Sequence, residues 1–303
     1  MPSVGLFFLD SGAHSLYTEH VLKKNKKGTQ DKNAFGYFDT QDFWSYVDKY
    51  AEFLKANPSI EYYVNVDVIF DPERSYRTLK YLEKIHGLNP VPVIHFGTDL
   101  KWIRKHLADG YEFLGIGGLG QEATRKKYKS WADNVFGILC PKSNDYLPIV
   151  RTHGFAMTSF ELMLRYPWWS VDSASWVKQA AYGVIYIPHK RGGLFDFSIP
   201  PYNVCVSTGN QKSKEKSLEI KSRRRTLVDV DVEARDQKLR YRSLKSAEKA
   251  IVCEWLEFVG TNIEEASENW EKRAMVNLKY FHTVCKEKPK PERFVPVYRK
   301  GLL

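Results

Sequence analysis

The chain has 303 residues, of which 43% are hydrophobic and 14% aromatic, and its formal net charge is +10. This length and apolar content suit one large domain or two small ones, and no apolar run is long enough to predict a membrane span. The positive charge favours a polyanionic partner without identifying it as nucleic acid.

Cysteine usage predicts a reduced protein. Cys140, Cys205, Cys253 and Cys285 are far apart in the sequence and form no CxxC pair. This spacing argues against a local zinc ribbon and against a disulfide framework, and residues 1–10 lack the basic region of a signal peptide. We therefore expect a cytoplasmic protein (in the host cytoplasm if a phage encodes it) with no cofactor and no metal. Zinc bound by cysteines distant in sequence stays an alternative.

Up to about residue 200, strand-like and helix-like segments alternate. Seven short apolar runs have the character of buried strands: 4–10, 61–70, 90–97, 111–120, 149–157, 168–173 and 183–188. Between them, a helix is predicted to begin at the N-cap Thr40, another to end at Gly87, and a third to run from Thr98 to Gly110. Segment 121–140 carries a helical apolar stripe.

This alternation predicts an α/β fold with a parallel sheet. Seven strands in this order favour a (β/α)8-type (TIM-like) barrel, incomplete or modified, over an open doubly wound sheet. We assign residues 1–206 to this barrel as the catalytic domain, and 207–303 to a basic, mostly helical region that packs on it. Segment 207–216 has the composition of a linker or exposed loop.

Basic residues predict where a nucleic acid would bind. The dense basic block lies at 212–225. We expect phosphate contacts from Arg191, Lys221, Arg223, Arg224 and Arg225. The alternative for such a block is a solvated helix face or a disordered arm.

Acidic and glycine residues recur where the predicted strands end, the edge at which parallel α/β folds bind ligands. They are Asp10, Ser11, Gly12, Asp67, Asp71, His95, Gly117, Gly118, Leu119, His153, Met157 and Asp172. Asp172 lies alone among tryptophans and serines in segment 166–177, and an isolated charge there is costly to bury unless it is paired or has a function.

Each of these residues also has a structural alternative. Asp10 before Ser-Gly is typical of a turn, and Asp71 before Pro72 is typical of a helix N-cap with proline at the first helical position. His95 and His153 can be core histidines with satisfied hydrogen bonds. The glycine-rich segment 115–120 is not a complete dinucleotide fingerprint.

The ordered series of segments resembles the tRNA-guanine transglycosylase superfamily, and most of all its short phage and bacterial relatives that insert 7-deazaguanines into DNA. DSGAHS at 10–15 resembles the family's Asp-Ser-Gly-Gly-Phe-Gln motif, and VDVIFDPERS at 66–75 its second, Asp-rich motif. VIHFG at 93–97, FLGIGGLG at 113–120 and THGFAMTS at 152–159 are similar to later family segments, and SVDSASW at 170–176 falls at the nucleophile.

The resemblance implies base exchange in DNA, with preQ0 or a similar free 7-deazaguanine as co-substrate. By this carry-over Asp172 is the nucleophile and Asp10 the carboxylate that handles protons. The resemblance assigns base binding to Ser11, Gly12, Asp67, Asp71, His95, Gly117, Gly118, Leu119, His153 and Met157. Carboxylates suit both roles, because they attack anomeric carbons and accept N–H donors.

The sequence departs from the family pattern at two points. The family's zinc-binding cysteines are absent, and Ser175 stands where the family has a second acid three residues after the first. Three alternatives therefore stay open: the same exchange on tRNA, a catalytically degenerate relative that binds nucleic acid, and a different barrel enzyme such as a glycoside hydrolase. A homo-oligomer or an accessory protein is also compatible with the sequence.

Overall fold

The computed structural model describes residues 8–22, 35–117, 125–157, 159–207, 239–287 and 291–296. The chain divides into two compact units. Unit 1 comprises residues 1–155, 167–171 and 292–303, and unit 2 comprises 156–166 and 172–291. The domain boundary expected at residue 206 stays a prediction.

Unit 1 alternates strands and helices. Its strands are β1 (Phe8–Leu9), β2 (Tyr62–Tyr63), β3 (Val93–His95), β4 (Phe113–Gly117), β5 (Arg151–Gly154) and β6 (Ser170–Val171). Its α-helices are α1 (Ala13–Tyr17), α3 (Gln41–Ala56), α4 (Pro72–His86), α5 (Lys101–Ala108) and α6 (Arg125–Leu139). A π-helical turn at Thr18–Leu22 and 3-10 turns at Gly36–Asp39 and Lys142–Asn144 complete the unit.

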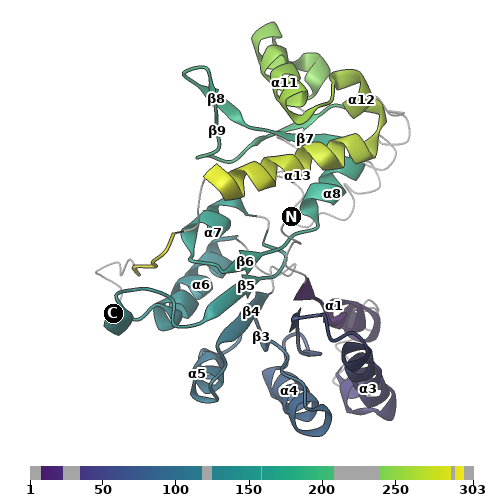
Figure 1. Cartoon of the computed structure of the whole chain (residues 1–303), viewed down its shortest axis with the longest axis vertical. Helices are drawn as coiled ribbons and strands as arrows, with labels where there is room; N and C mark the ends of the chain where they lie inside the picture. Colours follow the sequence, from purple (N-terminus) through teal and green to yellow (C-terminus); the bar gives the residue numbers. More distant parts are fainter. Residues whose placement is uncertain are drawn as a thin grey trace. The chain divides into compact units, whose positions relative to one another are not determined.

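The strands of unit 1 are parallel and pair in chain order. β1 pairs with β2, a parallel bridge joins Val64 to Val91, and β3, β4, β5 and β6 form one four-stranded parallel sheet. Helices α3, α4, α5 and α6 follow one another around these strands (Figure 1). The expected α/β class with a parallel sheet is confirmed for this unit.

Local signals explain where the helices of unit 1 begin and end. Thr40 caps α3 by accepting a hydrogen bond from Phe43 N, and Gly87 ends α4 with φ 66°. Both were predicted. The prediction that Thr98 caps the next helix is wrong. The N-cap residue of α5 is Leu100, and the Asp99 carboxylate accepts a hydrogen bond from Lys101 N at 2.8 Å.

One core cluster of unit 1 forms where α3 and α4 pack against the extended segment 64–68 that follows β2. Phe43, Val47, Val66, Val68 and Leu82 are fully buried there. Along α3 the buried residues Phe43, Val47, Tyr50 and Leu54 recur every three to four residues, which is the spacing of one helix face.

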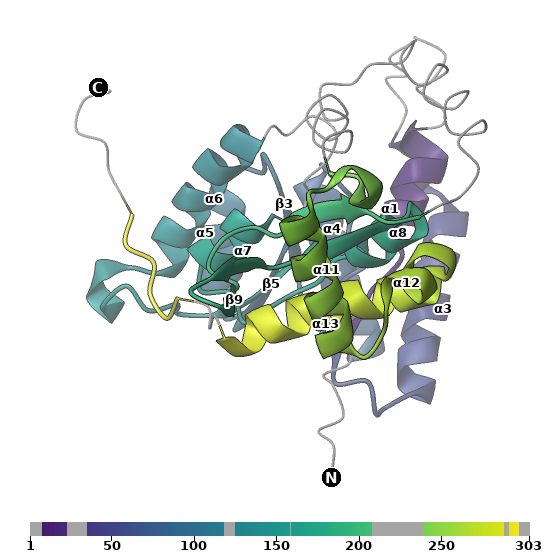
Figure 2. The same ribbon diagram turned by 90° about the horizontal axis from the view of Figure 1, so that it is seen from above.

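Unit 2 contains short strands and three C-terminal helices. Its strands are β7 (Val184–Ile187), β8 (His189–Arg191), β9 (Leu194–Asp196) and β10 (Tyr202–Cys205). Its helices are α7 (Phe160–Arg165), α8 (Ser175–Ala181), α11 (Ser246–Val259), α12 (Ile263–Glu268) and α13 (Trp270–Glu287), with a 3-10 turn at Tyr241–Ser243. Figure 2 shows α11 and α12 beside α13. Buried Ile185, Trp255, Val276 and Tyr280 join β7, α11 and α13 in one core.

The run at 183–188 differs from the expectation. It forms β7, but β7 pairs antiparallel with β10, with Ile187 opposite Tyr202. The prediction that this run joins the parallel strands is therefore wrong for the pairing seen in the described residues. The antiparallel hairpin β8–β9 was not predicted either, because its strands have three residues each.

The helical character of the C-terminal region is confirmed for residues 246–287. Asn269, the C-cap of α12, interrupts the helix and separates α12 from α13. The predicted linker at 207–216 lies almost wholly outside the described residues. Within the described part of the chain, no helix combines the length and apolar character needed to cross a membrane.

Candidate functional site

The predicted polar residues of unit 1 gather at one edge of its strands. Asp10 directly follows β1, His95 is the last residue of β3, and Gly117 is the last residue of β4. Asp67 lies four residues beyond β2. Because these strands are parallel and pair in chain order, their carboxyl ends meet at the same edge, where α/β folds bind ligands.

Asp67 and His95 form the best-defined polar pair of this edge. His95 Nε2 lies 2.5 Å from Asp67 Oδ2, and the two residues are 9% and 4% exposed. The Asp67 carboxylate is the acceptor of this bond, so Nε2 carries its hydrogen, and Nδ1 is an acceptor in the form of the imidazole that holds no second proton. Nδ1 is buried and has no hydrogen-bond partner in the described part of the chain. An acceptor held this way is suited to an N–H donor of a ligand.

Gly117 lies directly beside the unpartnered nitrogen of His95. A Cβ at this position would lie 3.2 Å from His95 Nδ1 and 3.8 Å from Cβ of Phe155. Any larger side chain would crowd the unpartnered nitrogen, so the glycine has a steric reason here. Gly118 and Leu119, the other predicted residues of this segment, lie outside the described residues.

Two tyrosines of α3, Tyr46 and Tyr50, lie near the carboxylate of Asp10. Tyr46 Oη donates to Ser11 O at 2.7 Å, and Gly12 has φ 76° with no room for a Cβ beside that hydroxyl. Burial raises the pKa of Tyr50, and the nearby Asp10 and Asp67 carboxylates raise it further. Both carboxylates thus act electrostatically on the same hydroxyl, and Ser11 Oγ is buried without a partner among the described residues.

Asp71 has the structural role proposed as its alternative. It caps α4, because Oδ1 accepts from Arg74 N at 2.9 Å, and Pro72 occupies the first turn. Its Oδ2 lies 2.5 Å from Arg74 Nη1. With both oxygens bonded to Arg74, Asp71 is less available to a ligand than His95.

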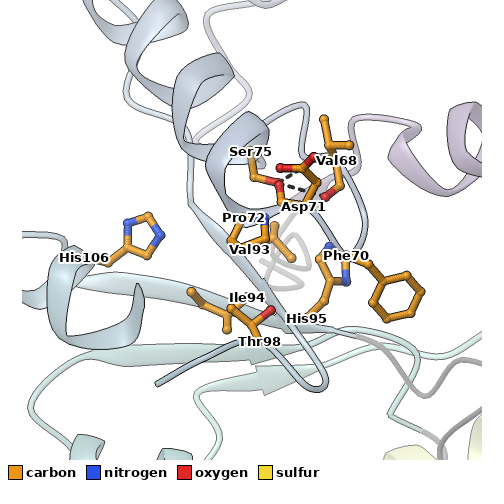
Figure 3. A pocket seen from close by; sticks show the side chains of 10 residues that line it. All are labelled: Val68, Phe70, Asp71, Pro72, Ser75, Val93, Ile94, His95, Thr98 and His106. Atoms are coloured by element: carbon orange, nitrogen blue, oxygen red, sulfur yellow. Dashed lines mark hydrogen bonds between the residues drawn. The ribbon is translucent and has the colours of Figure 1, made fainter. Parts of the chain in front are cut away.

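A small cavity separates the start of α4 from β3. It has a volume of about 10 Å³, the room of one water molecule. Figure 3 shows the side chains around it: Val68, Phe70, Asp71, Pro72, Ser75, Val93, Ile94, His95, Thr98 and His106. Burial lowers the pKa of His106 to about 4, so its imidazole is neutral at pH 7. The cavity is far too small for a purine, so a base would have to bind outside it.

Asp172 and Met157 come together in unit 2. Asp172 Oδ1 accepts from Ala156 N at 2.7 Å, and Asp172 O accepts from Met157 N at 2.8 Å. Asp172 is exposed and Met157 is buried. Ala156 has φ 52°, a left-handed conformation that is costly for a residue with a Cβ. A strained turn thus holds one oxygen of the predicted nucleophile.

His153 packs as a core residue of unit 1. It is 4% exposed, its ring stacks on Phe8 at 4.4 Å, and Nδ1 lies 2.7 Å from Ser170 Oγ. This is the alternative stated for it from the sequence, and its base-binding role stays a prediction.

Arg191 is the one predicted DNA contact that the structure describes. Its side chain is 78% exposed at the end of β8, and Nε lies 3.6 Å from Asp196 Oδ2. Lys221, Arg223, Arg224 and Arg225 lie outside the described residues.

No cluster of three or more His, Cys, Asp or Glu side chains suited to a metal ion occurs within the described ranges. The predicted absence of zinc therefore stays a prediction.

Sequence reasoning missed Tyr46, Tyr50 and Phe70. The tyrosines lie on the buried face of α3, where helical periodicity predicts ordinary core residues. Phe70 is distinguished by its left-handed backbone conformation. A phenylalanine rarely adopts this conformation, so the sequence gives no signal for it.

Comparisons with protein-family models, with curated proteins and with solved structures find no match to this chain.

Proposed function

We propose that the chain is a guanine transglycosylase that exchanges guanine in DNA for a 7-deazaguanine such as preQ0. The observation that carries the proposal is the buried Asp67–His95 pair, whose acceptor Nδ1 lies beside Gly117 at the carboxyl edge of the parallel strands. The resemblance of the sequence motifs gives the reaction, and this pair gives a physical basis for recognising a base with N–H donors.

The proposed fold of the catalytic part is a (β/α)8-type barrel, incomplete or modified. Six parallel strands that pair in chain order support it, since this is the order in which barrel strands follow one another.

In the proposed reaction Asp172 is the nucleophile. One of its carboxylate oxygens bonds to C1′ of the target deoxyguanosine while the bond from C1′ to N9 breaks. Asp10 donates a proton to the departing guanine. The incoming 7-deazaguanine then loses a proton to Asp10, bonds to C1′ and displaces Asp172, which restores both carboxyl groups.

Base recognition is assigned to His95, with Asp67 as its positioning residue. Guanine and 7-deazaguanines both present N–H donors, and we assign to His95 the neutral form, whose Nδ1 accepts one of them. Asp71 is bonded to Arg74 through both oxygens, so we assign it to the start of α4.

DNA is the proposed polymer, and the net charge of +10 together with exposed Arg191 supports an anionic partner. An enzyme that acts on C1′ within a duplex must extrude the nucleotide. Exchange on tRNA uses the same chemistry and differs through contacts to the 2′-hydroxyl.

Trapping a covalent intermediate tests the proposal. Purified protein is incubated with guanine-containing DNA, or with tRNA, with and without preQ0, and adducts that survive denaturation are measured beside base exchange. Asp172→Asn is the key variant, because asparagine keeps an oxygen that can accept the Ala156 N–H. Asp99→Asn, at a carboxylate exposed beside α5, is the matched control.

We expect a DNA adduct in the wild type and in Asp99→Asn, and none in Asp172→Asn. An adduct on tRNA alone would favour the tRNA enzyme. A folded wild-type protein that binds DNA without adduct or exchange would contradict the proposal and favour a degenerate binder.

A further inference from the structure

Phe70 occupies a turn position that normally belongs to glycine. Asp71 N donates to Val68 O at 2.9 Å, which closes a four-residue turn with Phe70 as its third residue. Phe70 has φ 66°, and turns with a left-handed third residue favour glycine there. A phenylalanine in this place costs free energy, and such costs concentrate at functional sites.

Hydrogen bonds with the Ser75 side chain fix the backbone of this turn. Ser75 Oγ lies 2.8 Å from Val68 N and 2.8 Å from Asp71 O, and Ser75 is buried. Asp71 in turn caps α4. The backbone on both sides of Phe70 is therefore fixed before any ligand arrives.

The side chain of Phe70 is nevertheless exposed. The residue is 45% exposed, although Val66, Asp67 and Val68 just before it are buried. Its ring neighbours among the described residues both meet it at an angle: Tyr17 at 73° with centroids 5.7 Å apart, and His95 at 55° and 6.3 Å. Two inclined rings support Phe70 and leave part of its surface accessible to a flat ligand.

His95 supplies a hydrogen-bond acceptor beside this ring. Its Nδ1 is buried and unpartnered in the described chain, with Asp67 fixing the other nitrogen. Figure 3 shows Phe70 next to His95, at the rim of the small cavity. Because that cavity holds only about one water molecule, a planar ligand would have to lie on the exposed side of Phe70.

We infer that Phe70 is the stacking platform for the base, so that a planar nitrogen heterocycle lies against its ring with an N–H edge directed to His95. The identity of the heterocycle as guanine or a 7-deazaguanine rests on the proposed function. The strain at Phe70 then has a purpose, since it holds an aromatic ring in the solvent-facing position that a glycine turn would leave empty.

Calorimetric titration with free preQ0 tests the platform, using the full chain and four variants. Phe70→Trp keeps an aromatic face, Phe70→Leu keeps apolar volume without one, and Phe70→Ala removes both. Phe53→Ala is the matched control, since Phe53 is 50% exposed on α3 outside the site. Unfolding curves check that each variant is folded.

We expect Phe70→Ala and Phe70→Leu to weaken preQ0 binding by about tenfold or more, the usual size of a base-stacking contact. Phe70→Trp and Phe53→Ala should bind within about threefold of the wild type. Wild-type affinity in folded Phe70→Ala would overturn the platform and leave the base-exchange proposal intact. Equal weakening in Phe53→Ala would also overturn it.

The same titration separates the two proposals. A wild type that binds preQ0 through Phe70 but exchanges no base in DNA or tRNA would contradict the proposed function alone. A folded wild type that binds no preQ0 would overturn the platform, whatever the exchange assay shows.

Discussion

Phe70 and Ala156, which both carry a Cβ, adopt left-handed backbone conformations beside residues predicted for the site, Phe70 next to His95 and Ala156 next to Asp172. Ala156 points its N–H at the carboxylate of Asp172. A left-handed residue with a Cβ costs about 1–2 kcal/mol, so each turn is maintained by its surroundings and not by local preference.

Ala156→Gly should stabilise the protein. Glycine removes the steric cost of about 1–2 kcal/mol but makes the unfolded chain more flexible, which offsets about 0.4–1 kcal/mol. The net effect is an increase of about 0.5–1 kcal/mol in the free energy of unfolding, measured as a higher urea midpoint. The N–H that Asp172 accepts is retained.

Ala181→Gly, at the end of α8, is the control for that substitution. Ala181 has no left-handed strain to lose, so glycine there should lower the midpoint. The strain argument fails if Ala156→Gly lowers the midpoint as Ala181→Gly does.

At the scale of elements, the start of α4 combines a local cap with a longer-range ion network. Asp71 caps the helix, and Arg74 also binds Asp39 of the 3-10 turn Gly36–Asp39 at 2.5 Å. Arg77 reaches Asp39 as well, at 2.6 Å. The network ties the segment before α3 to α4 within unit 1.

Asp39 should make the stability of the protein depend on pH under acidic conditions. Hydrogen bonds from Arg74 and Arg77 lower the pKa of Asp39 from 3.8 to about 2. Since the folded state holds the lower pKa, the stabilisation is present above pH 4 and is lost as the pH falls from about 4 to about 2. The Asp39 side chain is 42% exposed, so solvent screening limits its contribution to about 0.5–1 kcal/mol.

Asp39→Asn measures this contribution. Urea unfolding at pH 7 and at pH 3 should show a smaller loss of stability on acidification for the variant than for the wild type. Glu52→Gln, at an exposed carboxylate of α3, should leave the loss unchanged. An identical loss in wild type and Asp39→Asn would show that the network does not stabilise the fold.

At the scale of the whole molecule, the proposed binding to DNA should depend on the positive charge. The net charge is +10, and each neutralised phosphate adds about −0.9 to the slope of log K against log salt concentration. Fluorescence anisotropy over a range of salt concentrations gives this slope for a labelled duplex.

Changing Lys221, Arg223, Arg224 and Arg225 together to alanine should reduce the magnitude of that slope by about 3–4, and Arg191→Ala by about 1. Lys101→Ala, which removes a lysine that is 65% exposed on α5, should leave the slope unchanged. An unchanged slope in the fourfold variant would show that these four residues do not contact DNA phosphates.

Much of the secondary structure could be predicted from the sequence. The seven apolar runs all contain strands, and Thr40, Asp71 and Gly87 are helix ends. The hairpin β8–β9 could not be predicted, since three-residue strands leave too short an alternation to detect.

For the candidate site, the sequence indicated candidate residues but not which of them pair with one another. Asp67 and His95 were both predicted, yet their hydrogen bond joins residues 28 positions apart. Asp71 could be interpreted as a ligand or as a cap, and the contacts of its two oxygens with Arg74 favour the cap.

The sequence by itself determined the charge, the order of the first seven strands, and the ends of several helices. These depend on composition and on contacts within three or four residues, which a local pattern contains. Only the tertiary structure decided that β7 pairs antiparallel with β10, that Asp67 orients His95, and that Phe70 stays exposed in a strained turn. Each of these depends on residues that come together only when the strands pair and the helices pack, and no local pattern records that arrangement.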